Sequence, residues 1–117
     1  MKQCIFVYGT LRKRASHHRN LHDAQWLANA WVKGVLYSMG WYPAMVLTEN
    51  GETKVRGEIY LIDEKTLAEL DDYEGDQYQR VRIVAEDDHG CTHQAWIWEA
   101  RTIADQPIIL SGDWLQQ

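Results

Sequence analysis

The chain has 117 residues and a mass of 13.7 kDa, a length that fits a single domain over residues 1–117. Twelve Lys and Arg against 17 Asp and Glu give a formal net charge of −5, which argues against nucleic acid as a partner because that partner requires a basic surface. No apolar run approaches the roughly 20 residues of a membrane span, and two cysteines without a secretory signal predict reduced thiols in a cytoplasmic protein.

The first part of the chain predicts a strand, a loop and a second strand. Residues 4–8 form a short apolar, β-branched run that Gly9 ends, which is typical of a strand. Residues 10–23 are polar and rich in histidine without an apolar period, so we expect a loop with room for one helical turn. Residues 31–39 suit a second strand with a bulge at Gly34.

The middle of the chain carries the strongest hairpin signal, Asn50-Gly51. Two segments that suit strands, residues 44–48 and 55–62, flank this dipeptide. We therefore expect these two strands to pair with each other across a tight turn.

One helix follows. Asp63 is a favourable N-cap, and residues 64–73 place Leu67 and Leu70 on one apolar stripe. The stripe predicts a helix that packs on the sheet through this face.

The last part of the chain predicts two more strands. Residues 79–86 alternate apolar and basic side chains, as a half-buried strand does. A turn over residues 88–90 leads into residues 92–99, where Trp96 and Trp98 share a face. About six short strands with one main helix and short helical segments indicate an α+β fold, a small mixed β-barrel with the helix packed on it.

The first candidate site is Tyr8-Gly9-Thr10-Leu11-Arg12, directly after the first strand. Glycine lets the backbone turn sharply, and successive N–H groups can then form an anion-binding nest. Arg12, Lys13 and Arg14 add positive charge, so a carboxylate or phosphate could bind. The alternative is an ordinary turn that ends the strand, beside a solvated basic patch.

The second candidate is Glu74, at the end of the predicted helix. It lies seven residues after Leu67 and four after Leu70, so its carboxylate falls on the apolar stripe if the helix continues that far. A partly desolvated carboxylate has a raised pKa, which suits a general base near neutral pH. Alternatively the helix stops at Asp72, and Glu74 points into water with Gly75 after the last helical turn.

Two further features of the sequence are better explained without a catalytic or metal-binding role. Arg80 can pair with Glu74 or Asp71 or lie exposed on its strand, and we assign it no catalytic role. His17, His18 and His22 include an i, i+4 pair at metal-ligand spacing, but a solvated loop explains them better, because the acidic residue of an HExxH motif is missing. We therefore predict neither a metal site nor a cofactor.

In this order and spacing, the motifs of the chain resemble those of the γ-glutamylcyclotransferase-like family, which includes the AIG2-like γ-glutamylamine cyclotransferases. The resemblance covers nearly the whole chain. The segments that carry it are Tyr8-Gly9-Thr10-Leu11-Arg12, Tyr42-Pro43-Ala44, Val55-Arg56-Gly57-Glu58-Ile59-Tyr60, Leu70-Asp71-Asp72-Tyr73-Glu74-Gly75 with Tyr78-Gln79-Arg80, and Ser111-Gly112-Asp113-Trp114.

The resemblance implies a small mixed barrel that uses no cofactor and has a cavity at one end. It implies that Tyr8, Gly9, Thr10 and Leu11 contact the glutamyl part of a small-molecule substrate and that Glu74 is the general acid/base. The reaction it implies is release of 5-oxoproline and an amine or amino acid from a γ-glutamyl amide, by attack of the α-amine on its own γ-carbonyl. Some members of the family lack the glutamate that matches Glu74. This chain has it, which favours activity.

Two points stay open. Trp31, Trp41, Trp96 and Trp98 lie outside the shared motifs and either shape a leaving-group pocket or fill the core. The alternative function is a non-catalytic module that binds a small acidic metabolite in the same pocket. The sequence does not identify the leaving amine or the oligomeric state.

Overall fold

The computed structural model describes residues 2–12, 21, 24–49 and 52–117, and over these residues it has six strands and one α-helix. The elements in chain order are β1 (Lys2–Val7), β2 (Gln25–Ser38), β3 (Pro43–Leu47), β4 (Lys54–Asp63), α1 (Glu64–Glu74), η2 (Gly75–Gln77), β5 (Tyr78–Asp87), β6 (Thr92–Ala100) and η3 (Trp114–Gln116).

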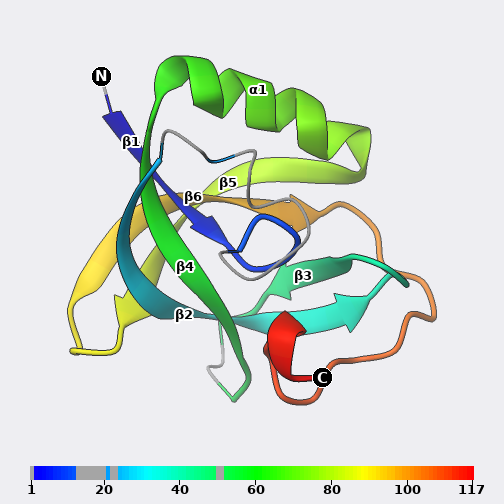
Figure 1. Cartoon of the computed structure of the whole chain (residues 1–117). Helices are drawn as coiled ribbons and strands as arrows, with labels where there is room; N and C mark the ends of the chain where they lie inside the picture. Colours follow the sequence, from blue (N-terminus) through cyan, green and yellow to red (C-terminus); the bar gives the residue numbers. More distant parts are fainter. Residues whose placement is uncertain (1, 13–20, 22–23, 50–51) are drawn as a thin grey trace.

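Five of the strands close into a barrel, and β3 extends one side of it (Figure 1). The sheet order is β3-β2-β4-β1-β6-β5, and a short antiparallel pairing of β2 with β5 closes the ring. The β1–β6 pair is parallel and the other pairs are antiparallel, so the barrel is mixed as predicted.

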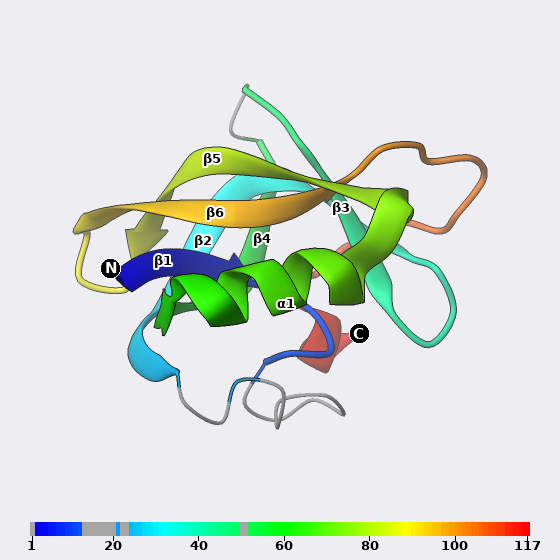
Figure 2. The same cartoon turned by 90° about the horizontal axis from the view of Figure 1, so that it is seen from above.

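Residues 5–7, the second half of β1, are buried on both faces of the strand, which explains their continuous apolar run. Phe6 belongs to a core cluster with residues from all the other strands, which fills the barrel. Ile5 and Val7 point the other way, into a second cluster that includes Leu67 and Leu70 of α1. Figure 2 shows α1 lying across this side of the barrel, in front of β1.

The helix begins where the sequence predicts. The Asp63 carboxylate accepts a hydrogen bond from the Thr66 backbone N–H at 2.8 Å, and Leu67 and Leu70 are its buried residues. The β5–β6 hairpin, with its turn at residues 88–90, is also confirmed, and so is the shared face of Trp96 and Trp98, which pack on the same cluster.

Two expectations about β2 and its neighbours are wrong. The strands β3 and β4 lie on opposite sides of β2 in the sheet and do not form the predicted hairpin. The dipeptide Asn50-Gly51 lies outside the described residues, and a turn signal of this kind indicates a reversal without fixing which strands pair. The irregularity in β2 falls between Trp26 and Ala28 and not at Gly34.

Both cysteines are free thiols, Cys4 partly buried and Cys91 exposed. Across the part of the chain that the structure describes, no helix has the length and apolar character to cross a membrane.

Candidate active site

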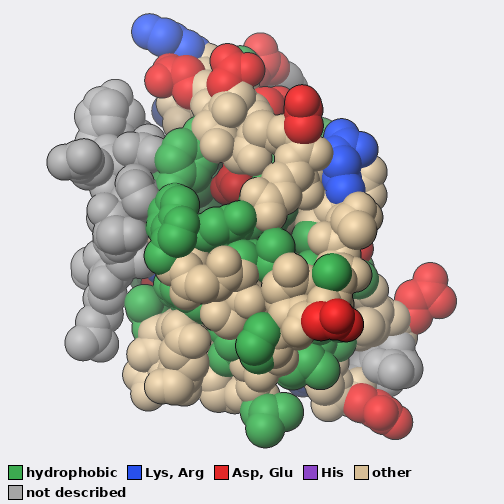
Figure 3. Space-filling model, turned by 90° about the vertical axis from the view of Figure 1, so that its right-hand side faces the viewer, with side chains coloured by type: hydrophobic (Ala, Val, Ile, Leu, Met, Phe, Trp, Pro, Cys, Tyr) green, Lys and Arg blue, Asp and Glu red, His purple; other side chains and the backbone are tan. Residues whose placement is uncertain are grey.

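A cavity of about 290 Å³ opens where α1 ends, beside the turns that follow β1 and β2. Figure 3 faces this side of the molecule, where hydrophobic side chains surround a recessed acidic one. The lining residues come from five segments that the fold brings together: Phe6, Val7, Tyr8, Gly9, Thr10, Leu11, Trp41, Tyr42, Pro43, Tyr73, Glu74, Gln77, Tyr78 and Trp98. All five residues predicted to form the site, Tyr8, Gly9, Thr10, Leu11 and Glu74, are among them.

The turn after β1 forms one wall of the cavity. The Arg12 N–H donates to the Gly9 carbonyl at 3.0 Å and closes the turn. Gly9 does not have a positive φ; instead a Cβ here would lie 2.5 Å from Pro43 Cγ, so glycine allows β3 to approach the turn. The buried Tyr8 hydroxyl donates to the Trp98 carbonyl at 2.6 Å, which ties the turn to β6.

Glu74 is the last residue of α1, and the structure favours the first of the two alternatives for it. The helix continues through Glu74 and ends at Gly75, whose φ of 71° is left-handed. The Gly75 N–H donates to the Asp71 carbonyl, so Gly75 caps the helix. Because the cap follows Glu74 in the chain, Glu74 is still helical and lines the cavity. Burial raises the pKa of the Glu74 carboxyl from 4.5 to about 7.

Tyrosine side chains line the same cavity as this carboxyl group. Burial, with Glu74 nearby, raises the pKa values of Tyr8 and Tyr78 above their usual range, so both phenols stay protonated. The Tyr78 hydroxyl donates to the Pro43 carbonyl at 2.7 Å. The Tyr73 hydroxyl lies 3.2 Å from Thr10 Oγ1 and bridges the end of α1 to the turn after β1.

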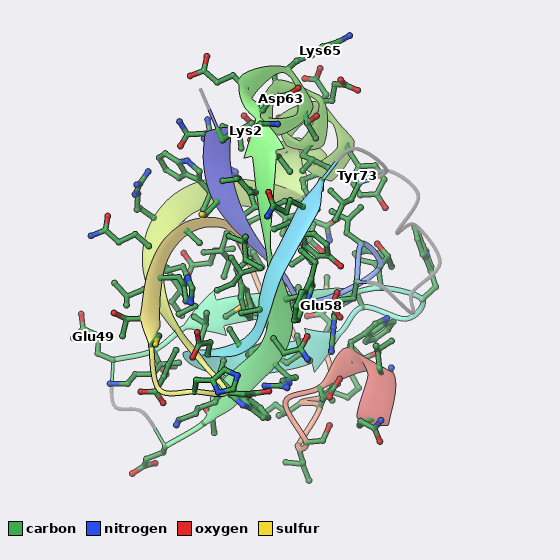
Figure 4. All side chains as sticks on the ribbon, turned by 60° about the vertical axis from the view of Figure 1, so that its left-hand side comes forward. Lys2, Glu49, Glu58, Asp63, Lys65 and Tyr73 are labelled. Atoms are coloured by element: carbon green, nitrogen blue, oxygen red, sulfur yellow. The ribbon has the colours of Figure 1, made fainter. Side chains whose placement is uncertain are left out.

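Arg12 does not serve the anion-binding role that the basic patch suggested. Its guanidinium is buried between two carboxylates, with Nε 3.1 Å from Glu58 Oε2 and Nη1 2.6 Å from Asp113 Oδ1. Figure 4 shows Glu58 inside the molecule, whereas Lys65 and Glu49 project outward. Arg12 therefore supports the turn from behind, and Lys13 and Arg14 lie outside the described residues.

Of the remaining candidates that the structure describes, two tryptophans line the cavity, and Arg80, Trp31 and Trp96 do not. Arg80 pairs with Asp71, with Nε 3.0 Å from Oδ1, so it is not the exposed strand residue that the sequence also allowed. Trp41 and Trp98 line the cavity, whereas Trp31 stacks under Arg56 and Trp96 under Arg80 and Arg82. The histidine cluster of His17, His18 and His22 lies outside the described residues.

Sequence reasoning assigned no role to Tyr73, Gln77 and Tyr78, which also line the cavity. Their proximity to Glu74 in the chain was a usable signal, because a helix end and the strand after it carry side chains to one place. The contribution of Tyr42 and Pro43 depends on the β2–β3 turn reaching the end of α1, and periodicity does not predict that tertiary contact.

Comparison with known proteins assigns the fold and the family. Residues 5–116 match the family model described as "Gamma-glutamyl cyclotransferase, AIG2-like". A Vibrio cholerae protein named as a candidate gamma-glutamylcyclotransferase is 39% identical over 120 residues, covering 100% of this chain and 99% of the relative. The gamma-glutamylcyclotransferase family protein YtfP of Escherichia coli K12 is 36% identical, covering 97% of this chain and 96% of YtfP.

Solved structures agree with this assignment. The crystal structure of YkqA from Bacillus subtilis superposes with a TM-score of 0.83 at 32% identity, covering 97% of this chain and 40% of YkqA. An AIG2-like protein from Mus musculus gives a TM-score of 0.78 at 25% identity, covering 89% of this chain and 80% of that one.

Proposed function

Because the chain belongs to the gamma-glutamyl cyclotransferase, AIG2-like family, we propose that it converts a γ-glutamyl amide into 5-oxoproline and a free amine or amino acid. The observation that carries the proposal is the position of Glu74, a carboxyl group with a pKa of about 7 in a cavity lined by the turn after β1.

The proposed reaction is an intramolecular acyl transfer. The α-amine nitrogen attacks the γ-carbonyl carbon, a new C–N bond closes a five-membered ring, and the bond from this carbon to the amide nitrogen breaks. Water is not consumed. Holding the substrate folded for this attack can supply up to roughly 7–11 kcal/mol of the barrier reduction.

Near neutral pH the α-nitrogen loses two protons as it changes from an ammonium group to the ring N–H, and the leaving nitrogen gains two as it departs as an ammonium ion. Glu74 is proposed to carry one of these protons, and solvent exchanges the other. The α-amine is mostly protonated near neutral pH and cannot attack in that form, so a base must first remove its proton. The leaving nitrogen must gain a proton before it departs as an amine. A carboxyl group with a pKa of about 7 can accept the first proton and return it, a contribution of about 10²–10⁴ in rate.

The turn after β1 is proposed to bind the glutamyl headgroup through Tyr8, Gly9, Thr10 and Leu11. Peptide N–H groups bind a carboxylate and can stabilise the oxyanion that forms on the γ-carbonyl oxygen. The Tyr73–Thr10 bridge supports this arrangement, because it fixes the turn relative to the residue before Glu74.

The test is an assay of 5-oxoproline release from a panel of γ-glutamyl amides. Glu74→Gln should lower kcat at least 100-fold while it preserves the fold, and Glu69→Gln, an exposed position on the same helix, should behave as wild type. Wild-type turnover by Glu74→Gln would contradict the assigned role. Binding of 5-oxoproline without turnover of any amide would favour the alternative, a metabolite-binding module.

A further inference from the structure

We propose that Trp41, Tyr42 and Gln77 form the leaving-group subsite, and that this subsite favours amines carrying an aromatic or alkyl group next to the scissile nitrogen. We call these three residues the rim. The inference rests on the proposed cyclotransferase function and adds the part of the substrate that the rim selects.

Two side-chain bridges connect the end of α1 to the rest of the cavity wall, and Glu74 lies between them in the chain. Tyr73, directly before Glu74, bonds to Thr10 in the turn after β1. Gln77, three residues after Glu74, bonds to Tyr42, whose hydroxyl lies 2.9 Å from Nε2 and 3.1 Å from Oε1. The two bridges therefore mark two parts of the cavity wall, which we call the Thr10 end and the Tyr42 end.

Exposure distinguishes the two ends. Thr10 is 8% exposed, whereas Trp41 is 69% exposed and Gln77 also lies at the surface. If the headgroup occupies the Thr10 end, the scissile bond lies near Glu74 and the leaving amine extends toward the rim. An amine leaving in this direction reaches solvent directly.

The rim is held in place by backbone bonds. The Met39 N–H donates to the Tyr42 carbonyl at 2.9 Å and closes the β2–β3 turn. The Arg101 N–H donates to the Gln77 carbonyl at 3.0 Å and fixes η2. A subsite formed by two fixed segments can select a ligand without first being ordered, which lowers the entropic cost of binding.

The chemistry of the rim favours stacking. Its three side chains are an indole, a phenol and an amide, all uncharged, and the phenol and amide are hydrogen-bonded to each other. Trp41 meets Tyr42 edge-on, with ring centroids 4.7 Å apart at 65°, and most of its surface is exposed. Burying such a ring against an aromatic or alkyl group is favourable and needs no new polar partner.

The experiment compares γ-glutamylbenzylamide with γ-glutamylmethylamide, whose leaving group is too short to reach the rim. Wild type should favour the benzyl compound in kcat/KM by about tenfold. Trp41→Ala should remove this preference by slowing the benzyl compound alone. Trp26→Ala, which removes another exposed tryptophan (51%) outside the cavity lining, should leave the preference unchanged.

Affinities separate the subsite from catalysis. Calorimetry with the Glu74→Gln protein should show the same preference for the benzyl compound, and the added Trp41→Ala substitution should abolish it. This calorimetric result would support the subsite even if wild type turned over neither compound. Absence of turnover would overturn only the proposed function. Equal losses for both compounds in Trp41→Ala, or an unchanged preference, would overturn the subsite, and so would failure of both compounds to bind.

Discussion

Glu74 is held partly buried in the folded protein at a cost to stability. Its carboxyl pKa is about 7 in the folded protein against an ordinary 4.5. Below pH 4.5 the group is protonated in both the folded and the unfolded chain, so it costs nothing. Between pH 4.5 and 7 only the unfolded chain ionises, so the free energy of unfolding falls as pH rises, by roughly 3 kcal/mol in total.

We therefore predict that Glu74→Gln stabilises the protein at pH 8 by up to roughly 3 kcal/mol and changes stability little at pH 5. Urea denaturation of both proteins at the two pH values measures the difference. Glu69→Gln, on the exposed face of the same helix, should show no such pH-dependent gain. Equal stability of Glu74→Gln and wild type at pH 8 would mean that the carboxyl group is solvated.

The same residue shows how far the sequence could be read. Its place on the apolar stripe follows from helical periodicity, but the sequence leaves open whether the helix continues through residue 74, because Gly75 is compatible with either ending. Arg12 shows the opposite case. Three basic residues in a row suggest either an anion site or a solvated basic patch, whereas Arg12 is buried against Glu58 and Asp113, which are 46 and 101 residues away in the chain.

Among the elements, the turn after β1 depends most on distant parts of the chain. Arg12 closes the turn through its backbone and joins it to β4 and the C-terminal segment through its side chain. The Tyr60 hydroxyl also donates to Glu58, at 2.8 Å. Removing one member of a buried ion pair is strongly destabilising, because its partner is left charged and unpaired.

Arg12→Met should lower the free energy of unfolding by about 3–5 kcal/mol. Arg56→Met is the matched control, since Arg56 pairs with the exposed Asp88 at 2.6 Å and stacks on Trp31. A surface pair of this kind contributes less, about 1–2 kcal/mol with the stacking included. Equal losses in the two variants, measured by urea denaturation, would contradict a special role for Arg12.

The elements themselves were mostly predictable, but their pairing was less so. Alternation and turn residues placed the helix and most of the six strands, but β2 begins at Gln25, six residues before the predicted start at Trp31. The partner of β3 could not be predicted, because β2 is long enough to pair with β3 over one part and with β4 over another. Closure of the barrel by Ala30 and Trp31 of β2 against β5 is a long-range pairing that local signals do not encode.

At the scale of the whole molecule, the C-terminal segment is hydrogen-bonded to two strands of the barrel, β2 and β4. The Ser38 N–H of β2 donates to the Pro107 carbonyl, and the Ile109 N–H donates to the Leu36 carbonyl. The Arg56 N–H of β4 donates to the Gly112 carbonyl. These bonds join β2 to β4 just before Asp113 reaches Arg12. The segment therefore couples the sheet to the turn that lines the cavity.

We expect this coupling to depend on Gly112. Its φ is 71°, and a Cβ there would collide with the Lys54 carbonyl oxygen. Gly112→Ala should therefore lower the free energy of unfolding by at least about 3 kcal/mol, because the strained backbone and the collision both oppose folding. Thermal denaturation measures the loss.

Gly90→Ala isolates the collision, because Gly90 also has a positive φ, of 82°, but a Cβ there would meet nothing within 4 Å. Its loss should stay near 1 kcal/mol, the cost of the left-handed backbone alone. Moving the Gly112 segment should also displace Asp113, so Gly112→Ala should weaken binding of 5-oxoproline while Gly90→Ala does not. Equal stabilities of the two variants, with equal affinities for 5-oxoproline, would show that the C-terminal segment does not couple the sheet to the turn that lines the cavity.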